Sequence, residues 1–368
     1  MQQIGFRAAA LALLALCLLA GRAIADKIDD YVETEREAQH IPGLALLVVD
    51  DGKIVKQQGY GLANVEHQVP VKPETIFQSG SVGKQFTAAA VLLLVEDGKL
   101  ALDDPVRKHL PDAPESWQPM TIRHLLSHTS GLRGMPLDFD YRRDYTEDEL
   151  LETIFGLRLA TKPGYSWGYS NAGYVTLGIL IHKVSGVPYG EFLRQRVFEP
   201  LGMTATRVIS DTDIVANRAA GYRLVDGELK NHKWVSPTMN STADGSLYFN
   251  IVDLAKWDAA LDGDALLSDA SRKAMWTPQL LFDGKPNKAS YGFGWVCVDT
   301  PGQRRVAHGG AWQGFTTYIA RYLDDRLTVV VLTNLSADSK SDPGKIARHV
   351  AGLVRPSLAL PSEQSSGE

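Results

Sequence analysis

Cysteine is almost absent from this chain of 368 residues, which contains only Cys17 and Cys297. Cys17 lies in an N-terminal segment that we predict to be removed, which would leave Cys297 as a single thiol. A lipoprotein would use Cys17 as its acylated residue, but Leu16 precedes it where a small residue is expected. One cysteine cannot form an intramolecular disulfide bond, so the packed core alone must stabilise the fold. The sequence leaves open whether Cys297 is reactive.

The chain also lacks any run of basic residues. Lysine and arginine total 38 against 43 aspartate and glutamate residues, which gives a formal net charge of −5 and a pI of about 6.0. Nucleic acids and anionic membrane surfaces attract basic proteins, so we expect neither as a partner. No internal repeat and no low-complexity linker interrupts the sequence.

No hydrophobic run is long enough to span a bilayer. The N-terminal apolar segment, Ala8 to Ala20, follows Arg7 and precedes the small-x-small sequence Ala23-Ile24-Ala25. This combination is typical of a cleaved signal peptide. We therefore predict that residues 1–25 are removed and that the protein is secreted, with the bacterial periplasm as its location and no stable membrane insertion.

Patterns typical of strands occur near both ends of the predicted mature chain. Gly43–Val49 and Ile54–Gly59 are apolar, β-branched runs on either side of Asp51-Gly52, a pair that favours a tight hairpin turn. Further strands are expected near the C-terminus at Tyr291–Val298, Arg305–His308, Phe315–Tyr322 and Leu327–Asn334.

Between these strands, residues 103–284 have the pattern of short helices separated by proline and glycine, one of them opened by the capping box Thr146–Glu149. The simplest packing is an antiparallel sheet made from both chain ends, flanked by helices and carrying this helical insertion. We therefore predict an α+β fold whose α/β part comprises residues 26–102 and 285–357. Residues 358–368 are predicted to form a disordered tail.

The most informative stretch is Phe77–Thr87, in which Ser81 precedes Lys84 by three residues at the start of an apolar helix. Residues i and i+3 of a helix share a face, so the Lys84 amine can reach back to the Ser81 hydroxyl. A serine hydroxyl needs a base to act as a nucleophile at neutral pH, and a neighbouring lysine can take its proton. Unpaired backbone N–H groups at the helix start would stabilise an acyl oxyanion.

The alternative is an ordinary helix-capping serine, because Ser-x-x-Lys is a short pattern. Ser81 is, however, the only serine in the chain that is followed by lysine at this spacing. The segment that follows, Ala88–Val95, is apolar on all sides and is therefore expected in the core. A serine and a lysine at the end of a buried helix favour catalysis over capping.

Two other stretches place polar groups near element boundaries. Residues 169–171 (Tyr-Ser-Asn) lie where a turn-rich loop meets a helix, and residues 308–312 (His-Gly-Gly-Ala-Trp) follow a short predicted strand. Taken alone, Tyr169 would be a half-buried loop tyrosine. As a third element beside the serine–lysine pair, it gains a chemical role.

The three stretches together resemble the serine β-lactamase and penicillin-binding-protein superfamily, which uses Ser-x-x-Lys, Tyr-x-Asn or Ser-x-Asn, and Lys-Thr-Gly or His-x-Gly elements. Within it the chain is most similar to the class C β-lactamase-like group, which includes esterases and D-amino-acid peptidases. Residues 121–132, 199–203 and 291–295 resemble further signatures of that group. The likeness covers nearly all of the mature chain and implies a β-lactamase/transpeptidase-like fold.

The resemblance implies a role for each residue of the set. Ser81 would be the acylated nucleophile, Lys84 its partner in proton transfer, and Tyr169 the relay of protons to the leaving group. Asn171 would bind the acyl side chain of the substrate and hold Lys84. The backbone N–H groups of Ser81 and Ala311 would form the oxyanion hole. The glycines beside that strand would let the substrate carbonyl come close to it. The substrate-binding strand would comprise Gly309, Gly310, Ala311 and Trp312.

The chain departs from the superfamily at His308 and Gly309. The lactamases and many transpeptidases have a lysine followed by a hydroxyl residue there, and both groups favour a carboxylate on the substrate. Histidine is mostly neutral at pH 7, and glycine supplies no hydroxyl. We therefore expect inefficient recognition of a penicillin or of a peptide carboxylate, and we expect His308 in the catalytic set as a hydrogen-bonding partner of Tyr169.

Two other patterns point to structural roles. His124 and His128 are four residues apart but lack the glutamate of the zinc-protease pattern, so we expect no metal site. Ser79 occupies the first glycine position of a Gly-x-Ser-x-Gly elbow around Ser81, which disfavours an α/β-hydrolase triad.

The sequence thus predicts a secreted, cofactor-free serine hydrolase that forms an acyl-enzyme on an ester or amide. Expected substrates are small esters and D-amino-acid peptides or peptidoglycan-derived peptides, as for a D-alanyl-D-alanine carboxypeptidase, with β-lactams third. Two alternatives stay open. One is a penicillin-binding sensor that is acylated once without turnover, and the other is a catalytically idle relative with a structural or interaction role.

Overall fold

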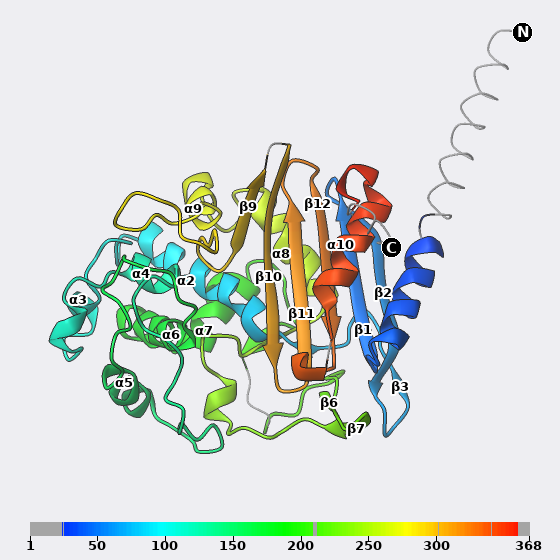
Figure 1. The fold of residues 1–368 in the computed structure, drawn as a ribbon, viewed down its shortest axis with the longest axis horizontal. Helices are drawn as coiled ribbons and strands as arrows, with labels where there is room; N and C mark the ends of the chain where they lie inside the picture. Colours follow the sequence, from blue (N-terminus) through cyan, green and yellow to red (C-terminus); the bar gives the residue numbers. More distant parts are fainter. Residues whose placement is uncertain (1–23, 25, 209–211, 301, 340, 360–368) are drawn as a thin grey trace, which may run out of the picture.

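The computed structural model describes residues 24, 26–208, 212–300, 302–339 and 341–359. Apart from residue 24, the predicted signal peptide lies outside the described residues, as does most of the predicted tail. A seven-stranded antiparallel sheet, in the order β3-β2-β1-β12-β11-β10-β9, forms one half of the molecule, and helices and loops form the other half (Figure 1). The predicted α+β fold is therefore confirmed.

The sheet joins the two ends of the chain. The first hairpin pairs Val49 with Ile54 across the predicted turn, and β1 then pairs with β12, for example Leu46 with Val331. The strands are β1 (Gly43–Asp50), β2 (Lys53–Asn64), β3 (Val69–Pro70), β9 (Val296–Thr300), β10 (Gln303–Trp312), β11 (Phe315–Tyr322) and β12 (Leu327–Thr333).

Both faces of the central strands are buried, because successive side chains of a strand point to opposite faces. In β1, Leu44, Leu46 and Val48 pack in a cluster with α10 (Pro343–Val354) and with the helical residues 26–38. The alternate residues Ala45, Leu47 and Val49 pack in a second cluster, which contains the central helix α2 (Lys84–Glu96). The sheet is thus covered on both faces by helices (Figure 1).

The helical part surrounds α2, in which every residue from Lys84 to Leu94 is buried, as the apolar sequence predicted. The capping box at Thr146 and Glu149 is confirmed, with both reciprocal hydrogen bonds present. The remaining helices are α3 (Val106–His109), α4 (Ile122–Leu126), α5 (Glu147–Phe155), α6 (Asn171–Ser185), α7 (Tyr189–Leu193), α8 (Ile251–Asp262) and α9 (Asp269–Met275). Short strands lie among them at β4 (Phe77–Gln78), β5 (Arg207–Val208), β6 (Tyr222–Val225), β7 (Glu228–Asn231) and β8 (Leu247–Phe249). Within the described ranges, no helix has the length and apolar character needed to cross a membrane.

The structure corrects two strand boundaries near the C-terminus. Strand β10 does not end at His308 but continues to Trp312, since Gly309 pairs with Tyr318 of β11 and Trp312 pairs with Phe315. The strand expected from residue 291 instead begins at Val296. The chain before it forms a loop whose Gly294 has a φ of +76°, a conformation that a strand does not use.

The structure also corrects the start of the predicted tail. Leu358 was expected to be disordered, but it lies in a short 3-10 turn, Pro356–Leu358, and is 7% exposed. Its side chain belongs to the cluster beneath α10. The burial of this leucine explains why the ordered chain continues past the predicted boundary.

Candidate active site

Ser81 lies in a 3-10 turn, Gly80–Gly83, that leads directly into α2. Lys84 is the first residue of α2 and is completely buried. In a 3-10 turn the side chains of residues i and i+3 eclipse one another, which brings these two together more closely than an α-helix would. The Lys84 Nζ lies 3.2 Å from the Ser81 Oγ. The structure thus brings the predicted nucleophile and its predicted base into contact.

Lys84 is held by two further acceptors. Its Nζ donates to the Asn171 Oδ1 at 2.9 Å and to the backbone carbonyl of Asp244. Asn171 is positioned as the first residue of α6, whose N-cap Ser170 accepts a hydrogen bond from the backbone of Gly173. The predicted link from Asn171 to Lys84 is therefore present. The Asp244 carbonyl was not foreseen, because it lies 160 residues from Lys84 in the chain and no motif marks it.

Tyr169 lies beside this pair, immediately before the cap of α6. Its ring centroid is 5.0 Å from the Lys84 Nζ, and its side chain is partly exposed. Together with Ser81 it lines one groove. A partly exposed hydroxyl in this groove is accessible to a substrate that has reached Ser81.

Glycines allow β10 to approach the 3-10 turn. A Cβ atom on Gly310 would lie 2.2 Å from the Ser79 carbonyl oxygen and 3.0 Å from the Ser81 nitrogen. A Cβ atom on Gly80, where φ is +50°, would lie 2.4 Å from the Ala311 nitrogen. No other residue type fits these positions without displacing the backbone. The close approach places the turn that carries Ser81 against the part of β10 that carries Ala311, and both residues line the groove.

His308 is buried, and both of its ring nitrogens are used within the protein. A carbonyl oxygen can only accept, so the contact of 2.6 Å between His308 Nδ1 and the Gly309 oxygen places the ring proton on Nδ1. The Nε2 then accepts from the Tyr291 hydroxyl at 2.8 Å. Burial, reinforced by the charge of Lys84, lowers the pKa of His308 to about 4. The sequence suggested Tyr169 as the hydrogen-bonding partner of His308. The structure shows that the partner is Tyr291.

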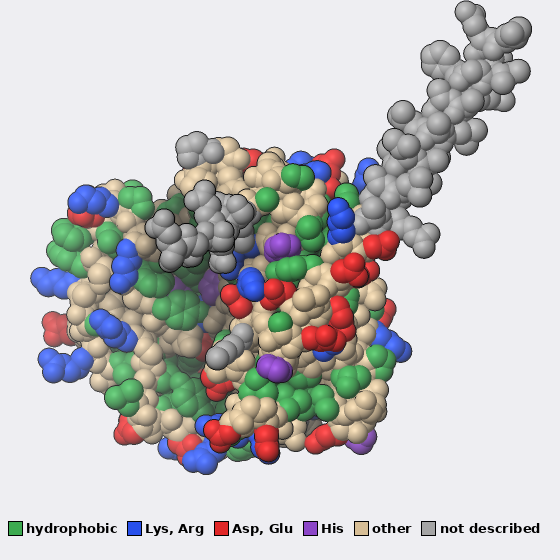
Figure 2. All heavy atoms as spheres, turned by 45° about the vertical axis from the view of Figure 1, so that its right-hand side comes forward, with side chains coloured by type: hydrophobic (Ala, Val, Ile, Leu, Met, Phe, Trp, Pro, Cys, Tyr) green, Lys and Arg blue, Asp and Glu red, His purple; other side chains and the backbone are tan. Residues whose placement is uncertain are grey.

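The groove that contains Ser81 has a volume of about 460 Å³. It runs along β10 and β11 to the start of α10, where Asp342, Pro343 and Arg348 line its far end. In the space-filling view a deep hollow separates the helical part from the sheet part (Figure 2). Of the predicted binding strand, Gly309, Gly310 and Ala311 line the groove.

Trp312 does not line the groove, although the sequence assigned it to substrate contact. Its indole nitrogen donates to the Asn240 Oδ1 at 2.7 Å, and its ring packs edge-on against Tyr141. Trp312 therefore connects the end of β10 to the helical part through these two contacts.

The two predicted structural histidines differ in their surroundings. His124 completes a capping box at the start of α4, where its Nδ1 accepts from the Thr121 backbone. His128 is buried directly behind Tyr169, with the two ring centroids 4.2 Å apart. In the described part of the chain, no group of three His, Cys, Asp or Glu side chains is arranged to hold a metal ion.

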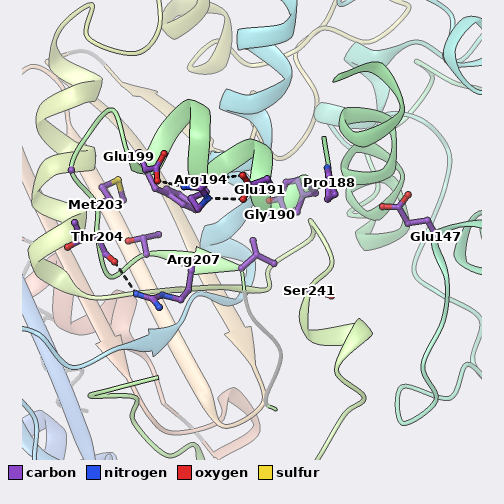
Figure 3. Close-up of a pocket in the computed structure, with 15 residues that line it drawn as sticks. Glu147, Pro188, Gly190, Glu191, Arg194, Glu199, Met203, Thr204, Arg207 and Ser241 are labelled. Carbon is purple, nitrogen blue, oxygen red and sulfur yellow. Dashed lines mark hydrogen bonds and ion pairs between the residues drawn. The ribbon is translucent and has the colours of Figure 1, made fainter. Parts of the chain in front are cut away.

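A second cavity, of about 820 Å³, lies away from Ser81 beside α7 (Figure 3). Its lining includes none of the predicted site residues. Arg194 pairs there with Glu191 and Glu199, and Arg207 donates to the Thr204 carbonyl. Since these arginines are already paired, we assign no role to this cavity.

Cys297 is 4% exposed. Burial raises its pKa to about 12, so at neutral pH the thiolate that reactivity requires is not formed. Cys297 is therefore an inert core residue.

Comparisons with known proteins show the family of this chain. The model of the Beta-lactamase family matches residues 28–352. The chain belongs to the Beta-lactamase family. A penicillin-binding protein of Bacillus subtilis (strain 168) is 32% identical over 338 residues, which cover 86% of this chain and 74% of that protein.

Two solved structures are similar to this chain over about nine tenths of its length. The octameric penicillin-binding protein homologue of Pyrococcus abyssi is 31% identical with a TM-score of 0.76, covering 90% of this chain and 77% of that one. The D-amino acid amidase of Ochrobactrum anthropi SV3, in complex with D-phenylalanine, is 25% identical with a TM-score of 0.77, covering 91% and 99%. Members of the Beta-lactamase family are serine hydrolases, and this chain is one of them.

Proposed function

We propose that this family member hydrolyses uncharged esters and amides through an acyl-enzyme at Ser81. The observation that carries the proposal is the contact between Lys84 Nζ and Ser81 Oγ, in a lysine that Asn171 also holds. In the first step the Ser81 oxygen bonds to the substrate carbonyl carbon while its proton passes to Lys84. The leaving group departs with a proton relayed through Tyr169, and water then releases the acid and restores Ser81.

Small esters and D-amino-acid amides or peptides are the leading substrate classes. The similarity to a D-amino acid amidase suggests D-amino acid amides, and the similarity to a penicillin-binding protein suggests peptidoglycan-derived peptides. Steady-state release of product from p-nitrophenyl esters, D-alanyl peptides and nitrocefin, run side by side, tests the proposal. Turnover supports a hydrolase, a single burst without turnover supports a penicillin-binding sensor, and no acylation at all supports an idle relative.

Preference for uncharged substrates follows from His308 and Gly309. His308 has both nitrogens occupied, and Gly309 has no hydroxyl, so this part of β10 offers no side-chain donor to a substrate carboxylate. A charge-assisted hydrogen bond contributes about 1.5–3 kcal/mol, and each 1.4 kcal/mol is a factor of about ten. We expect kcat/KM for nitrocefin to lie at least about a hundredfold below that for a short-chain ester.

The double variant His308→Lys with Gly309→Thr should narrow this gap. The site can accept the threonine, because a Cβ atom on Gly309 would meet nothing closer than 3.7 Å. The change in the ratio is the cleaner measurement, since esters are intrinsically easier to cleave than amides. Arg348, which lies 3.9 Å from Asp342, is a cationic side chain that also lines the groove. Arg348→Ala is therefore the control that tests whether a substrate carboxylate is bound there instead of at β10. An unchanged ratio in the double variant, with a loss of nitrocefin hydrolysis in Arg348→Ala, would contradict the role given to β10.

We further propose that the protein is exported after cleavage of residues 1–25. The support is the sequence of the N-terminal segment, which lies almost entirely outside the described residues. The intact mass of protein recovered from a bacterial periplasmic extract measures this directly. A chain that begins at Asp26 is the expected result, and an uncleaved chain confined to the cytoplasm would contradict it.

A further inference from the structure

His128 fixes the peptide on both sides of Tyr169. Its backbone carbonyl accepts from the N–H of Gly168 at 2.8 Å, and its Nδ1 accepts from the N–H of Ser170 at 3.1 Å. The residues immediately before and after Tyr169 are thus bonded to one histidine, 42 residues away in the chain from Ser170. This arrangement sets where the Tyr169 backbone lies relative to α6.

The same histidine also contacts the Tyr169 ring. The two ring centroids are 4.2 Å apart with an interplanar angle of 40°, and the rings of Tyr291 and Tyr174 pack on the imidazole at 4.6 and 5.0 Å. The Lys84 amine lies 5.0 Å from the Tyr169 ring centroid. The orientation of Tyr169 is therefore set by His128 as well as by the catalytic lysine.

His128 has features that stability alone does not explain. Its φ is +59°, a conformation that is strained for a residue with a side chain. Because Nδ1 accepts from Ser170, the proton of the neutral ring is on Nε2, and Nε2 is buried without a hydrogen-bond partner in the described parts of the chain. A strained backbone and an unpaired buried donor at one residue are typical of functional sites.

Resting on the function proposed above, we propose that His128 is a positioning residue that holds the Tyr169 hydroxyl where it can pass a proton to the leaving group. It does so by bonding the two flanking peptides and by packing against the ring. His128 does not touch Ser81, so the attack step depends on it less than leaving-group protonation does. Substrates with poor leaving groups should therefore be affected most.

Three variants of His128 separate its possible contributions. His128→Asn keeps an acceptor at the Nδ1 position and tolerates a positive φ, whereas His128→Leu loses the acceptor. We expect the leucine variant to lower kcat on an ethyl ester by about 30-fold with KM changed less than about threefold, and the asparagine variant to stay within about threefold of wild type. His128→Gln, which lacks the acceptor at this position but keeps a polar side chain, replaces the leucine variant if that protein does not fold.

A double-variant cycle with Tyr169→Phe gives the decisive readout. If His128 acts through the Tyr169 hydroxyl, His128→Leu should cost less than about threefold once that hydroxyl is gone. In the wild-type background, His128→Leu should slow hydrolysis of a p-nitrophenyl ester, whose leaving group needs no proton, much less than hydrolysis of the ethyl ester. Equal losses in the two backgrounds, equal losses on the two esters, or a leucine-sized loss in His128→Asn would each overturn the proposal.

The cycle also separates this proposal from the proposed function. If Tyr169→Phe alone keeps the wild-type rate on the ethyl ester, the relay role of Tyr169 is wrong and the role of His128 is overturned with it. If Tyr169→Phe is slow and His128→Leu is not, only the role of His128 is overturned. Labelling of Ser81 by a fluorophosphonate should survive in every His128 variant, because the contact between Ser81 and Lys84 is unchanged.

Discussion

At the scale of single residues, the Lys84 amine joins three segments that are far apart in the chain. Its hydrogen-bond partners are the Ser81 hydroxyl, the Asn171 side chain and the Asp244 carbonyl. Transfer of the Ser81 proton requires a neutral amine, whose two hydrogens go to Asn171 and Asp244 while its lone pair faces the Ser81 hydroxyl, so the three partners fix its position. The lysine therefore stays beside Ser81 instead of moving to solvent.

Lys84→Ala and Tyr169→Phe should each lower kcat by about 10² to 10⁴, the usual contribution of a general acid–base group. The lysine change should be the more damaging, because it removes proton transfer from the attack on the substrate itself. Steady-state kinetics on an ester and an amide provide the measurement. Lys288→Ala and Tyr165→Phe, which alter a lysine and a tyrosine near Trp167 and Phe282, are matched controls with little expected effect. Near wild-type rates in Tyr169→Phe on both substrates would refute its assignment.

The sequence predicted which residues lie together in the candidate site better than it predicted their contacts. Ser81, Lys84, Tyr169 and Asn171 occur in short motifs, and local helix geometry already places the first two together. The partnership of His308 with Tyr291 could not be predicted in the same way, because it depends on how β10 packs against the loop that holds Tyr291, 17 residues earlier in the chain.

At the scale of elements, the site depends on how closely β10 approaches the turn before α2. A Cβ atom on Gly310 would clash with the Ser79 carbonyl, whereas one on Gly309, one residue earlier, would meet nothing closer than 3.7 Å. Alternation along the strand explains the difference, since neighbouring residues point to opposite faces. The two glycines therefore allow the same substitution to be compared at two neighbouring positions of β10, one with a backbone clash and one without.

Gly310→Ala should separate β10 from the turn and lower kcat by about 10² or more, similar to the loss of one oxyanion-hole donor. The added methyl group would lie 2.2 Å from the Ser79 oxygen, so one backbone segment must shift. Gly309→Ala adds the same methyl group without this contact and should cost less than about tenfold. Kinetics on one ester, with a thermal melt of each variant, measure the effect. Equal losses in the two variants would show that the close approach does not matter.

The sequence predicted elements with strong periodicity and missed those that depend on a partner. Strands β1, β11 and β12 were predicted almost to the residue because their apolar, β-branched runs are continuous. The end of β10 was missed, because Gly309 and Gly310 have low strand propensity and are held in the strand by pairing with β11.

At the scale of the whole molecule, the core encloses two histidines in the neutral state. His308 and His128 are 6% and 1% exposed. Burial and the charge of Lys84 lower the pKa of His308 to about 4 and that of His128 well below its usual value. In the unfolded chain both would titrate near 6.5. Below that pH the unfolded chain binds protons that the folded protein does not bind, so acid favours unfolding.

The free energy of unfolding should therefore be constant with respect to these groups above pH 7 and fall as the pH drops from 6.5 toward 4. His308 alone should account for a loss of about 2 kcal/mol between pH 8 and pH 5, since each pKa unit is worth about 1.4 kcal/mol. Urea unfolding at the two pH values measures it. His308→Gln should lose about 2 kcal/mol less over the same range. The same pH dependence in both proteins would contradict the buried neutral state of His308.

Covalent labelling at Ser81 tests the central claim most directly. The wild-type protein, Ser81→Ala and Ser341→Ala are treated with a fluorophosphonate, and their intact masses are measured. Ser341 lines the same groove and is the matched control. We expect the mass of one probe to be added to wild type and to Ser341→Ala, and none to Ser81→Ala with an unchanged circular dichroism spectrum. Labelling of Ser81→Ala to the wild-type extent would show that the nucleophile is another residue.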